Sequence, residues 1–456
     1  MINLLDIKKN PQKEIQQKEI GFLQYVILVV FAVSIEIAFY AGETLDNKYL
    51  SFFAIGLLII SSCFLNMKNN MYLLLFLLPN QRYIVFPGDE TTLLNILIII
   101  MLFKLISSKG KFYIPSIILM QLLILYSLNI VMRLDSVNEV LIIVKMCITI
   151  VTLVGVFSRY AFDNSFYYNC VKFLGIGCLF ASCIALFGND EAVIGATSRF
   201  TGGINNNSNI FGAVLSFSIT SIFIIILTSI KQSKLLITLT TILFIFGLLT
   251  ESRSFVLAIS FAIIYILVFG AKLSSRTRKL IMCLLILIGI FIVVSITNPS
   301  SQFGEIFSSV TNRIINPKNG DLSNGRTELW YSYIKFLTTN IEYLFLGIGN
   351  NWKNFGFANV AHNGVLEVTA TYGLIGLILI VSLLFINWRK LRGIYLEKSS
   401  GNIKKRRVLY YLPLFTLGIT NLTGHDFFNL AFVIHLFMSC ACIYSLNSNV
   451  PQKQEI

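Results

Sequence analysis

The sequence has few charged residues: Asp, Glu, Lys and Arg make up 13% of its 456 positions, whereas 55% are hydrophobic. A soluble domain of average composition carries about twice that charged fraction. This shortage excludes an ordinary water-soluble protein. Apolar runs of roughly 17 to 21 residues recur along the whole chain instead, each long enough to cross a ~30 Å hydrocarbon layer. The pattern predicts an all-α, polytopic integral membrane protein.

Histidine and paired cysteine are also scarce. The chain has three histidines, at 362, 425 and 435, and its eight cysteines form no Cys-x-x-Cys pair. We therefore expect no metal site, and we interpret the cysteines as small core residues. The sequence contains no GxxxxGK[ST] motif and no GxGxxG after a strand, so no ATP or dinucleotide site and no cofactor is expected. The energy for any reaction or transport must therefore come from the substrate or from an ion gradient.

The distribution of positive charge orients the chain in the membrane. With the N-terminus in the cytoplasm, 25 of the 36 Lys and Arg residues fall on the inner side and 10 on the outer side. Because this split follows the positive-inside rule, the net charge of +14 implies membrane lipid and no nucleic acid as a partner. We expect the cell (inner, or cytoplasmic) membrane and about twelve to fourteen spans. The candidates are 21–41, 49–66, 71–87, 91–107, 115–132, 137–157, 168–187, 210–230, 234–250, 254–270, 279–297, 362–387, 409–424 and 427–446.

These spans predict five parts of the chain. The span at 71–87 is the least regular, because Pro79 and the polar residues after it suggest a short or re-entrant segment. One long external loop separates the eleventh and twelfth spans. The predicted parts are a cytoplasmic tail at 1–20, a transmembrane bundle at 21–297, the external loop at 298–361, C-terminal transmembrane helices at 362–446, and a cytoplasmic tail at 447–456.

The long external loop contains a predicted amphipathic helix at 326–340. Apolar residues recur there at helical spacing, which is typical of a helix lying on a membrane face. Asn324 and Gly325 precede it as cap-type residues, so Arg326 falls in the first turn, where free backbone N–H groups favour an anion. Alternatively, Arg326 only extends its charge to the membrane interface.

Two further external segments carry arginines. Residues 199–212, before a span, offer a basic side chain, a tight turn and amide groups that hydrogen-bond sugar hydroxyls. Arg253 lies in the tight turn 251–254 between two other spans. Each segment also has an ordinary interpretation, a Gly- and Asn-rich turn in the first case and a hairpin charge in the second. The candidate residues in 199–212 are Arg199, Gly202, Gly203, Asn205 and Asn207.

The twelfth span opens with polar residues. Asn363 and Glu367 are spaced i, i+4, on one face of the predicted helix, and His362 lies about 100° away at the same depth. A histidine and a carboxylate at the outer end of a span are costly unless they have a function, although an interfacial pair is the alternative. His435 lies within the last predicted span. His425 lies in a short turn that is predicted to be external, and it is the alternative to His362 as the functional histidine.

The order of these features resembles the O-antigen ligase and polymerase superfamily of Wzy-like and WaaL-like membrane glycosyltransferases. The shared pattern is an Arg-x-x-Gly-Gly loop, a Ser-Arg turn, Gly-Arg-x-x-x-Trp in the long loop, Gly347–Asn350, and His-Asn-x-x-Leu-Glu running to Gly376. The resemblance implies chemistry on the outer face, with Arg199, Arg253 and Arg326 holding a polyprenyl diphosphate and His362 beside the acceptor.

The implied reaction is an inverting, metal-independent glycosyl transfer. The glycan leaves a carrier such as undecaprenyl diphosphate while arginines stabilise the leaving group and His362 accepts the acceptor's proton. Asn363, Glu367, Asn205, Asn207, Gly202 and Gly203 are the candidate substrate-binding residues. We favour a polymerase of lipid-linked repeat units, with a chain-length regulator and a flippase of the same pathway as partners. A ligase of finished glycan is the alternative, and a non-enzymatic flippase is a weaker one, because the candidate residues cluster on one side.

Overall fold

The computed structural model describes residues 22–86, 92–108, 113–134, 137–187, 200, 207–228, 234–269, 282, 286, 289, 293, 297, 325–350, 352–357, 359–398, 407–422 and 429–445. These residues are almost entirely helical, and within them no strand forms beyond an isolated antiparallel bridge between Val85 and Thr92. Helices satisfy their own backbone groups, which a hydrocarbon layer requires. The prediction of an all-α membrane protein is confirmed.

Many of the described helices are separated from the next by only a few residues. In chain order they are α1 (Phe22–Thr44), α2 (Lys48–Phe64), α3 (Met67–Leu77), η2 (Leu78–Asn80), α4 (Leu94–Ser107), α5 (Ile114–Leu134), α6 (Val137–Arg159), α7 (Asn164–Phe187), α9 (Ser208–Thr228), α10 (Lys234–Leu249), α11 (Arg253–Phe269), α14 (Arg326–Thr339), α15 (Ile341–Leu346), η4 (Trp352–Phe355), α16 (Gly364–Lys398), α17 (Arg407–Tyr410), α18 (Leu412–Leu422) and α19 (Leu430–Ser445).

Twelve helices in the described part of the chain match predicted spans. Six are long and apolar enough to cross a membrane, namely α1, α5, α6, α7, α9 and α16, and the chain is therefore a multi-pass membrane protein. Six shorter apolar helices correspond to α2, α4, α10, α11, α18 and α19. The predicted span at 279–297 lies outside the described residues apart from five isolated positions.

The predicted span at 71–87 is not a single helix. The helical part, α3, ends at Leu77, and a 3-10 turn containing Pro79 follows, because proline cannot continue the backbone hydrogen-bond ladder. Leu73 to Leu78 are all fully buried, so this short helix lies inside the bundle. Most described cysteines are buried as predicted, whereas Cys63 is exposed.

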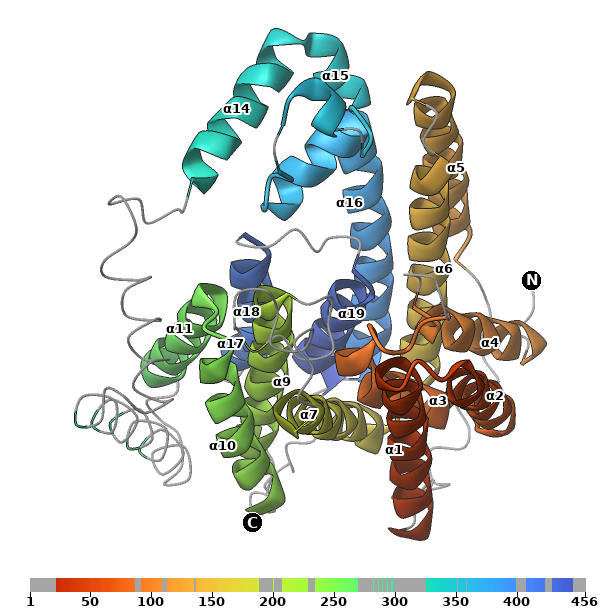
Figure 1. The fold of residues 1–456 in the computed structure, drawn as a ribbon, viewed down its shortest axis with the longest axis vertical. Helices are drawn as coiled ribbons and strands as arrows, with labels where there is room; N and C mark the ends of the chain where they lie inside the picture. The colour runs from red at the N-terminus through yellow and green to blue at the C-terminus, as the bar shows by residue number, and fades with distance from the viewer. Residues whose placement is uncertain are drawn as a thin grey trace.

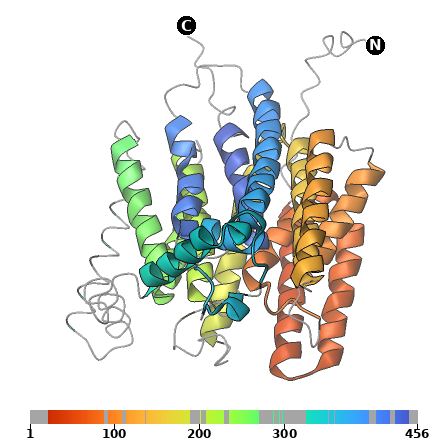
Figure 2. The same ribbon diagram turned by 90° about the horizontal axis from the view of Figure 1, so that it is seen from above.

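The long loop forms a second, smaller unit against α16. Helices α14 and α15 arch over one end of α16 in Figure 1, and Figure 2 shows α14 running crosswise to α11, α18 and α16. A separate apolar cluster holds the unit together, with Tyr333, Leu337, Ile348, Phe357, Ala361 and Ala370 at its centre. The predicted apolar face of α14 therefore packs largely on protein, although Ile334 is 52% exposed. The helix predicted at 326–340 is confirmed as α14.

Helix α16 is longer than its predicted span and is broken. It begins at Gly364, two residues after the predicted start, and it continues to Lys398. Arg389, Lys390 and Arg392, predicted in a loop, are therefore helical. Gly373 interrupts the helix with φ 68° and ψ 179°. The segment Gly364–Tyr372 thus takes its own direction, apart from the rest of α16.

Candidate functional site

The N-terminal ends of α9 and α11 meet at the Ser-Arg turn. Asn207 caps α9, because its Oδ1 accepts hydrogen bonds from the N–H groups of Asn209 (3.0 Å) and Ile210 (3.4 Å). Ser252 Oγ donates to Asn209 Oδ1 at 3.2 Å. A Cβ atom on Gly212 would lie 2.8 Å from Ser252 Cβ, so glycine permits this close approach. Asn207, a predicted sugar-binding residue, therefore has a clear structural role.

The Ser-Arg turn places Arg253 at the first position of α11. Glu251 adopts a left-handed conformation with φ 50°, and Thr250 Oγ1 accepts from the N–H of Ser252 at 3.3 Å. Arg253 is half-buried and follows the buried Ser252. The predicted tight turn is confirmed.

Arg326 opens α14 in the same way. Gly325 is the N-cap, in the left-handed conformation that glycine adopts at little cost, and, because glycine has no side chain, no side-chain hydrogen bond caps the helix. The pKa of Arg326 is lowered from its ordinary value, first by burial and second by the positive charge of Arg253. The structure therefore brings two predicted arginines close together, each at a helix N-terminus. The two positive charges repel each other, and each lies beside the free N–H groups of a helix end. An anion bound between them would offset this repulsion.

The segment before α16 is fastened to α14. Trp330 Nε1 donates to the carbonyl of Ala361 at 2.7 Å, and the Tyr333 hydroxyl donates to the carbonyl of Asn359 at 3.0 Å. Positions 326, 330 and 333 lie on one face of a helix. Arg326 therefore lies one turn before Trp330, on the face of α14 that binds Ala361, the residue before His362.

His362 and Asn363 lie just before α16, where the prediction had them within it. His362 has φ 52°, a left-handed conformation that is uncommon outside glycine. Asn363 is the helix cap, and its Oδ1 accepts from the N–H of Leu366 at 3.1 Å. The N–H of Glu367 donates to the Asn363 carbonyl at 2.8 Å, so Glu367 lies one turn into α16.

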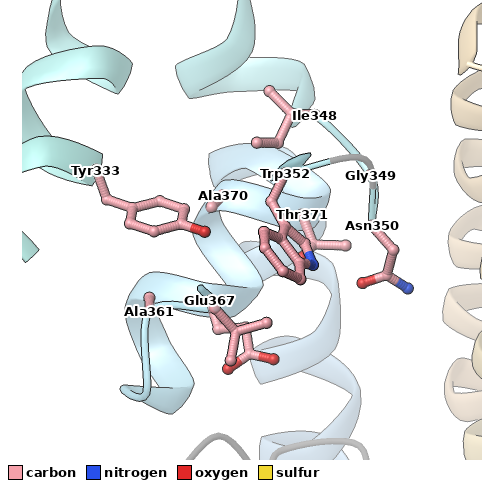
Figure 3. A pocket seen from close by; sticks show the side chains of 10 residues that line it. Tyr333, Ile348, Gly349, Asn350, Trp352, Ala361, Glu367, Ala370 and Thr371 are labelled. Carbon is pink, nitrogen blue, oxygen red and sulfur yellow. The ribbon is translucent and has the colours of Figure 1, made fainter. Parts of the chain in front are cut away.

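A small pocket lies between α14, η4 and the start of α16. Figure 3 shows the Tyr333 and Trp352 rings at its sides, with Glu367 below Trp352. The cavity volume is about 10 Å³, which is room for about one water molecule. Burial, and then the charge of Glu367, raises the pKa of Tyr333 to about 12. The lining residues are Tyr333, Ile348, Gly349, Asn350, Trp352, Val360, Ala361, Glu367, Ala370 and Thr371.

Several candidate site residues lie outside the part of the chain that the structure describes. Arg199, Gly202, Gly203, Asn205 and the rival His425 lie outside the described residues. Within the part of the chain that is described, no group of three His, Cys, Asp or Glu side chains could hold a metal ion.

Sequence reasoning also missed Trp330, Tyr333 and Trp352. The motifs Gly-Arg-x-x-x-Trp and Gly347–Asn350 were the available signals, because both place these rings near the arginine and histidine segments.

Comparison with known proteins bears on this part of the chain. Residues 236–381 match the Wzy_C family model, described as O-antigen ligase. No curated protein matches the sequence. The matched region covers Arg253, Arg326, His362, Asn363 and Glu367, and it excludes residues 199–207. It supports a glycosyltransferase-like enzyme of polysaccharide biosynthesis, of the O-antigen ligase or polymerase type, acting on lipid-linked oligosaccharide. The resemblance to the O-antigen ligase and polymerase superfamily is therefore confirmed over residues 236–381, the region that carries two of the three candidate arginines and His362.

Proposed function

We propose that this protein polymerises lipid-linked oligosaccharide repeat units during synthesis of a surface polysaccharide, such as an O-antigen, capsule or exopolysaccharide. The donor is a glycan on polyprenyl diphosphate, and the acceptor is a sugar hydroxyl on the outer face of the membrane. The observation that carries the proposal is the proximity of Arg253 and Arg326, each at a helix N-terminus. Two guanidinium groups with two helix ends suit a diphosphate, which offers several acceptor oxygens.

The transfer needs charge stabilisation on the leaving group. The bond between the anomeric carbon and the diphosphate oxygen breaks, and its electron pair stays on the diphosphate. Arg253 and Arg326 neutralise the developing negative charge, together with Arg199 from the preceding external loop. Because the arginines supply positive charge, the reaction proceeds without a metal ion. Chelation with EDTA should leave the rate unchanged.

The acceptor hydroxyl needs a base. In the proposal, the acceptor oxygen attacks the anomeric carbon from the face opposite the diphosphate, which inverts the configuration, while His362 takes the hydroxyl proton. Histidine is suited to this role because its ordinary pKa, about 6.5, lies close to neutral pH. Trp330 and Tyr333 support the segment next to His362, and Glu367 and Asn363 provide polar groups for the base or for acceptor hydroxyls.

The proposed location of the site on the outer face rests on the charge distribution of the chain and on the helix ends that lie close to one another. The starts of α9, α11 and α14 lie on one side, consistent with an outer-face site reached after a flippase delivers the donor. The termini are cytoplasmic and the protein resides in the cell membrane in this proposal. A chain-length regulator of the same pathway is the expected partner protein.

A ligase would use the same donor chemistry with a different acceptor, so the test must examine the product. The gene is deleted in the native host and the glycans are sized. A polymerase deletion leaves a single repeat unit attached to its carrier. Full-length chains accumulating on polyprenyl diphosphate would contradict the proposal and indicate a ligase, and loss of donor from the outer face would indicate a flippase.

A further inference from the structure

The break in α16 is held by the backbone of the Gly347–Asn350 loop. Gly373 has a φ and ψ that only glycine adopts readily, and Gly347 matches it with φ 78° and ψ 169°. A Cβ atom on Gly347 would lie 2.2 Å from the carbonyl oxygen of Thr371, so the two backbones touch. The loop thus packs directly against the interruption.

Loop residues also satisfy the carbonyl groups that the break exposes. An α-helix interrupted at residue 373 loses the i+4 partners of the preceding carbonyls. The N–H of Ile348 donates to the carbonyl of Ala370 at 2.8 Å, and the N–H of Gly349 donates to that of Thr371 at 2.9 Å. The hydroxyl of Tyr126, on α5, donates to the carbonyl of Tyr372 at 2.6 Å.

Glu139 joins this arrangement from α6. Its side chain is fully buried, and its two oxygens accept one hydrogen bond from the loop and one from the residue just before the break. Oε1 accepts from the N–H of Asn350 at 2.8 Å, and Oε2 accepts from the hydroxyl of Tyr372 at 2.6 Å. A buried carboxylate is costly unless hydrogen bonds satisfy it, so these two bonds are strong constraints. Glu139 therefore fixes the loop and the end of the broken segment to the same point of the bundle.

The segment that Glu139 fixes carries the candidate chemistry. Gly364–Tyr372 contains Glu367 and follows His362, and its direction is not set by the rest of α16 because Gly373 interrupts the helix. Asn350 and Thr371 also line the pocket beside Glu367. A displacement of about 1 Å at a reacting group can reduce a rate by about 10²-fold.

We infer that Glu139 is a positioning residue, which holds the His362 and Glu367 segment in register with the arginine pair through Asn350 and Tyr372. The inference rests on the proposed function. Glu139 touches no substrate in this arrangement, and it sets the placement of the groups that do. A merely structural role would instead lower the amount of folded protein without changing the turnover of what remains.

The test uses the purified full-length protein in lipid nanodiscs with purified lipid-linked repeat units. Glu139→Gln presents an amide N–H to one of two donors, and Tyr372→Phe removes the hydroxyl alone. Each should lower kcat about 10-fold or more while KM for the donor stays within about twofold, because the arginine pair lies on α11 and α14. The double variant should lose about as much as the more damaging single variant, well short of the product of the two losses, because both variants disturb the hydrogen bond between Tyr372 and Glu139.

Matched controls separate this effect from general damage. Glu36→Gln alters another buried carboxylate, which bonds to Asn80 at 2.9 Å far from the break, and Tyr331→Phe alters an exposed tyrosine on α14. Both should keep kcat within about twofold. Unchanged kcat in Glu139→Gln and Tyr372→Phe, a loss that follows the folded fraction alone, or losses that multiply in the double variant would each overturn the inference.

Hydrogen exchange gives a readout that does not depend on the enzymatic assay. In Glu139→Gln, peptides covering 345–350 and 364–372 should exchange faster than in the wild type, because the amide of Asn350 loses its carboxylate acceptor and the loop and the end of the broken segment are no longer held at one point. If wild-type protein transfers no glycan, the proposed function fails, and the exchange rates still decide whether Glu139 holds the break. Unchanged exchange in both peptides would refute the inference.

Discussion

Arg253 and Arg326 lie close enough that the charge of Arg253 lowers the pKa of Arg326, although they come from a hairpin turn and from the long loop between α11 and α16. Each is the first residue of a helix, so each brings free backbone N–H groups with its guanidinium. Burial of Arg326 strengthens the electrostatic effect, because fewer water molecules screen its charge. The two helix ends together form a concentrated positive region.

We predict that Arg253→Lys and Arg326→Lys each lower polymer formation about 10- to 100-fold while the protein level stays constant. Lysine keeps the charge but loses the paired hydrogen bonds to phosphate, worth about 1.5 to 3 kcal/mol for a charged group. The measurement is the rate of chain extension by purified enzyme. Arg82→Lys is the control, since Arg82 lies beside Glu43 away from this region. Full activity in both variants would exclude a diphosphate site here, and Arg199→Lys tests the third arginine in the same assay.

The hydrogen bond from Trp330 to Ala361 should matter for the position of His362. Trp330→Phe keeps an aromatic ring and removes the N–H donor, which leaves the Ala361 carbonyl without its 2.7 Å partner. We expect kcat to fall about 10-fold, with a loss of about 1 kcal/mol in the free energy of unfolding. Trp388→Phe, in the distant half of α16, should leave kcat unchanged. Equal kcat values for the two variants would show that the bond does not position the site.

Much of the candidate site follows from local sequence. The turn at Arg253, the helix starting at Arg326 and the polar start of α16 are short-range patterns, because caps and helical periodicity are set within a few residues. The family match over residues 236–381 confirms the resemblance that these motifs carry.

The remaining features depend on contacts between distant segments. Glu139 is a polar residue near the start of an apolar helix, and nothing within its own helix indicates that it bonds to Asn350 and Tyr372. The break at Gly373 likewise depends on the Gly347 backbone, which lies outside α16. At 71–87, the apolar pattern is strong enough to predict a span, but Pro79 and packing inside the bundle shorten the helix.

Two glycines of α16 should respond in opposite ways to alanine. Gly373→Ala forces a side chain into a conformation with φ 68° and brings its Cβ to 2.1 Å from the carbonyl oxygen of Phe345. We expect a loss of at least about 2 kcal/mol, seen as a lower Tm in detergent. Gly393→Ala meets nothing within 4 Å and should be neutral or raise stability by up to about 1 kcal/mol. A Gly373→Ala protein as stable as the wild type would show that α16 can run straight.

The predicted orientation can be checked by labelling α14 from outside intact cells. Ser332 is exposed on this helix, so Ser332→Cys in a background without other cysteines presents an accessible thiol. A membrane-impermeant maleimide should label it in intact cells, and it should label Ser400→Cys, in the predicted inner loop, only after permeabilisation. The reverse pattern would invert the topology and move the proposed chemistry to the cytoplasmic side.

The assignment of His362 as the base is tested against His425. A general base contributes about 10²- to 10⁴-fold to a rate, so His362→Ala should nearly abolish chain extension at an unchanged protein level, whereas His425→Ala should keep most of it. His435 is no rival, because it is buried in α19 with its ring stacked on Phe217 at 4.0 Å between centroids. For the wild type, kcat/KM should fall below neutral pH as the base becomes protonated, since a protonated imidazole cannot accept the acceptor's proton. Near wild-type extension by purified His362→Ala would transfer the role to His425 or to a carboxylate such as Glu367.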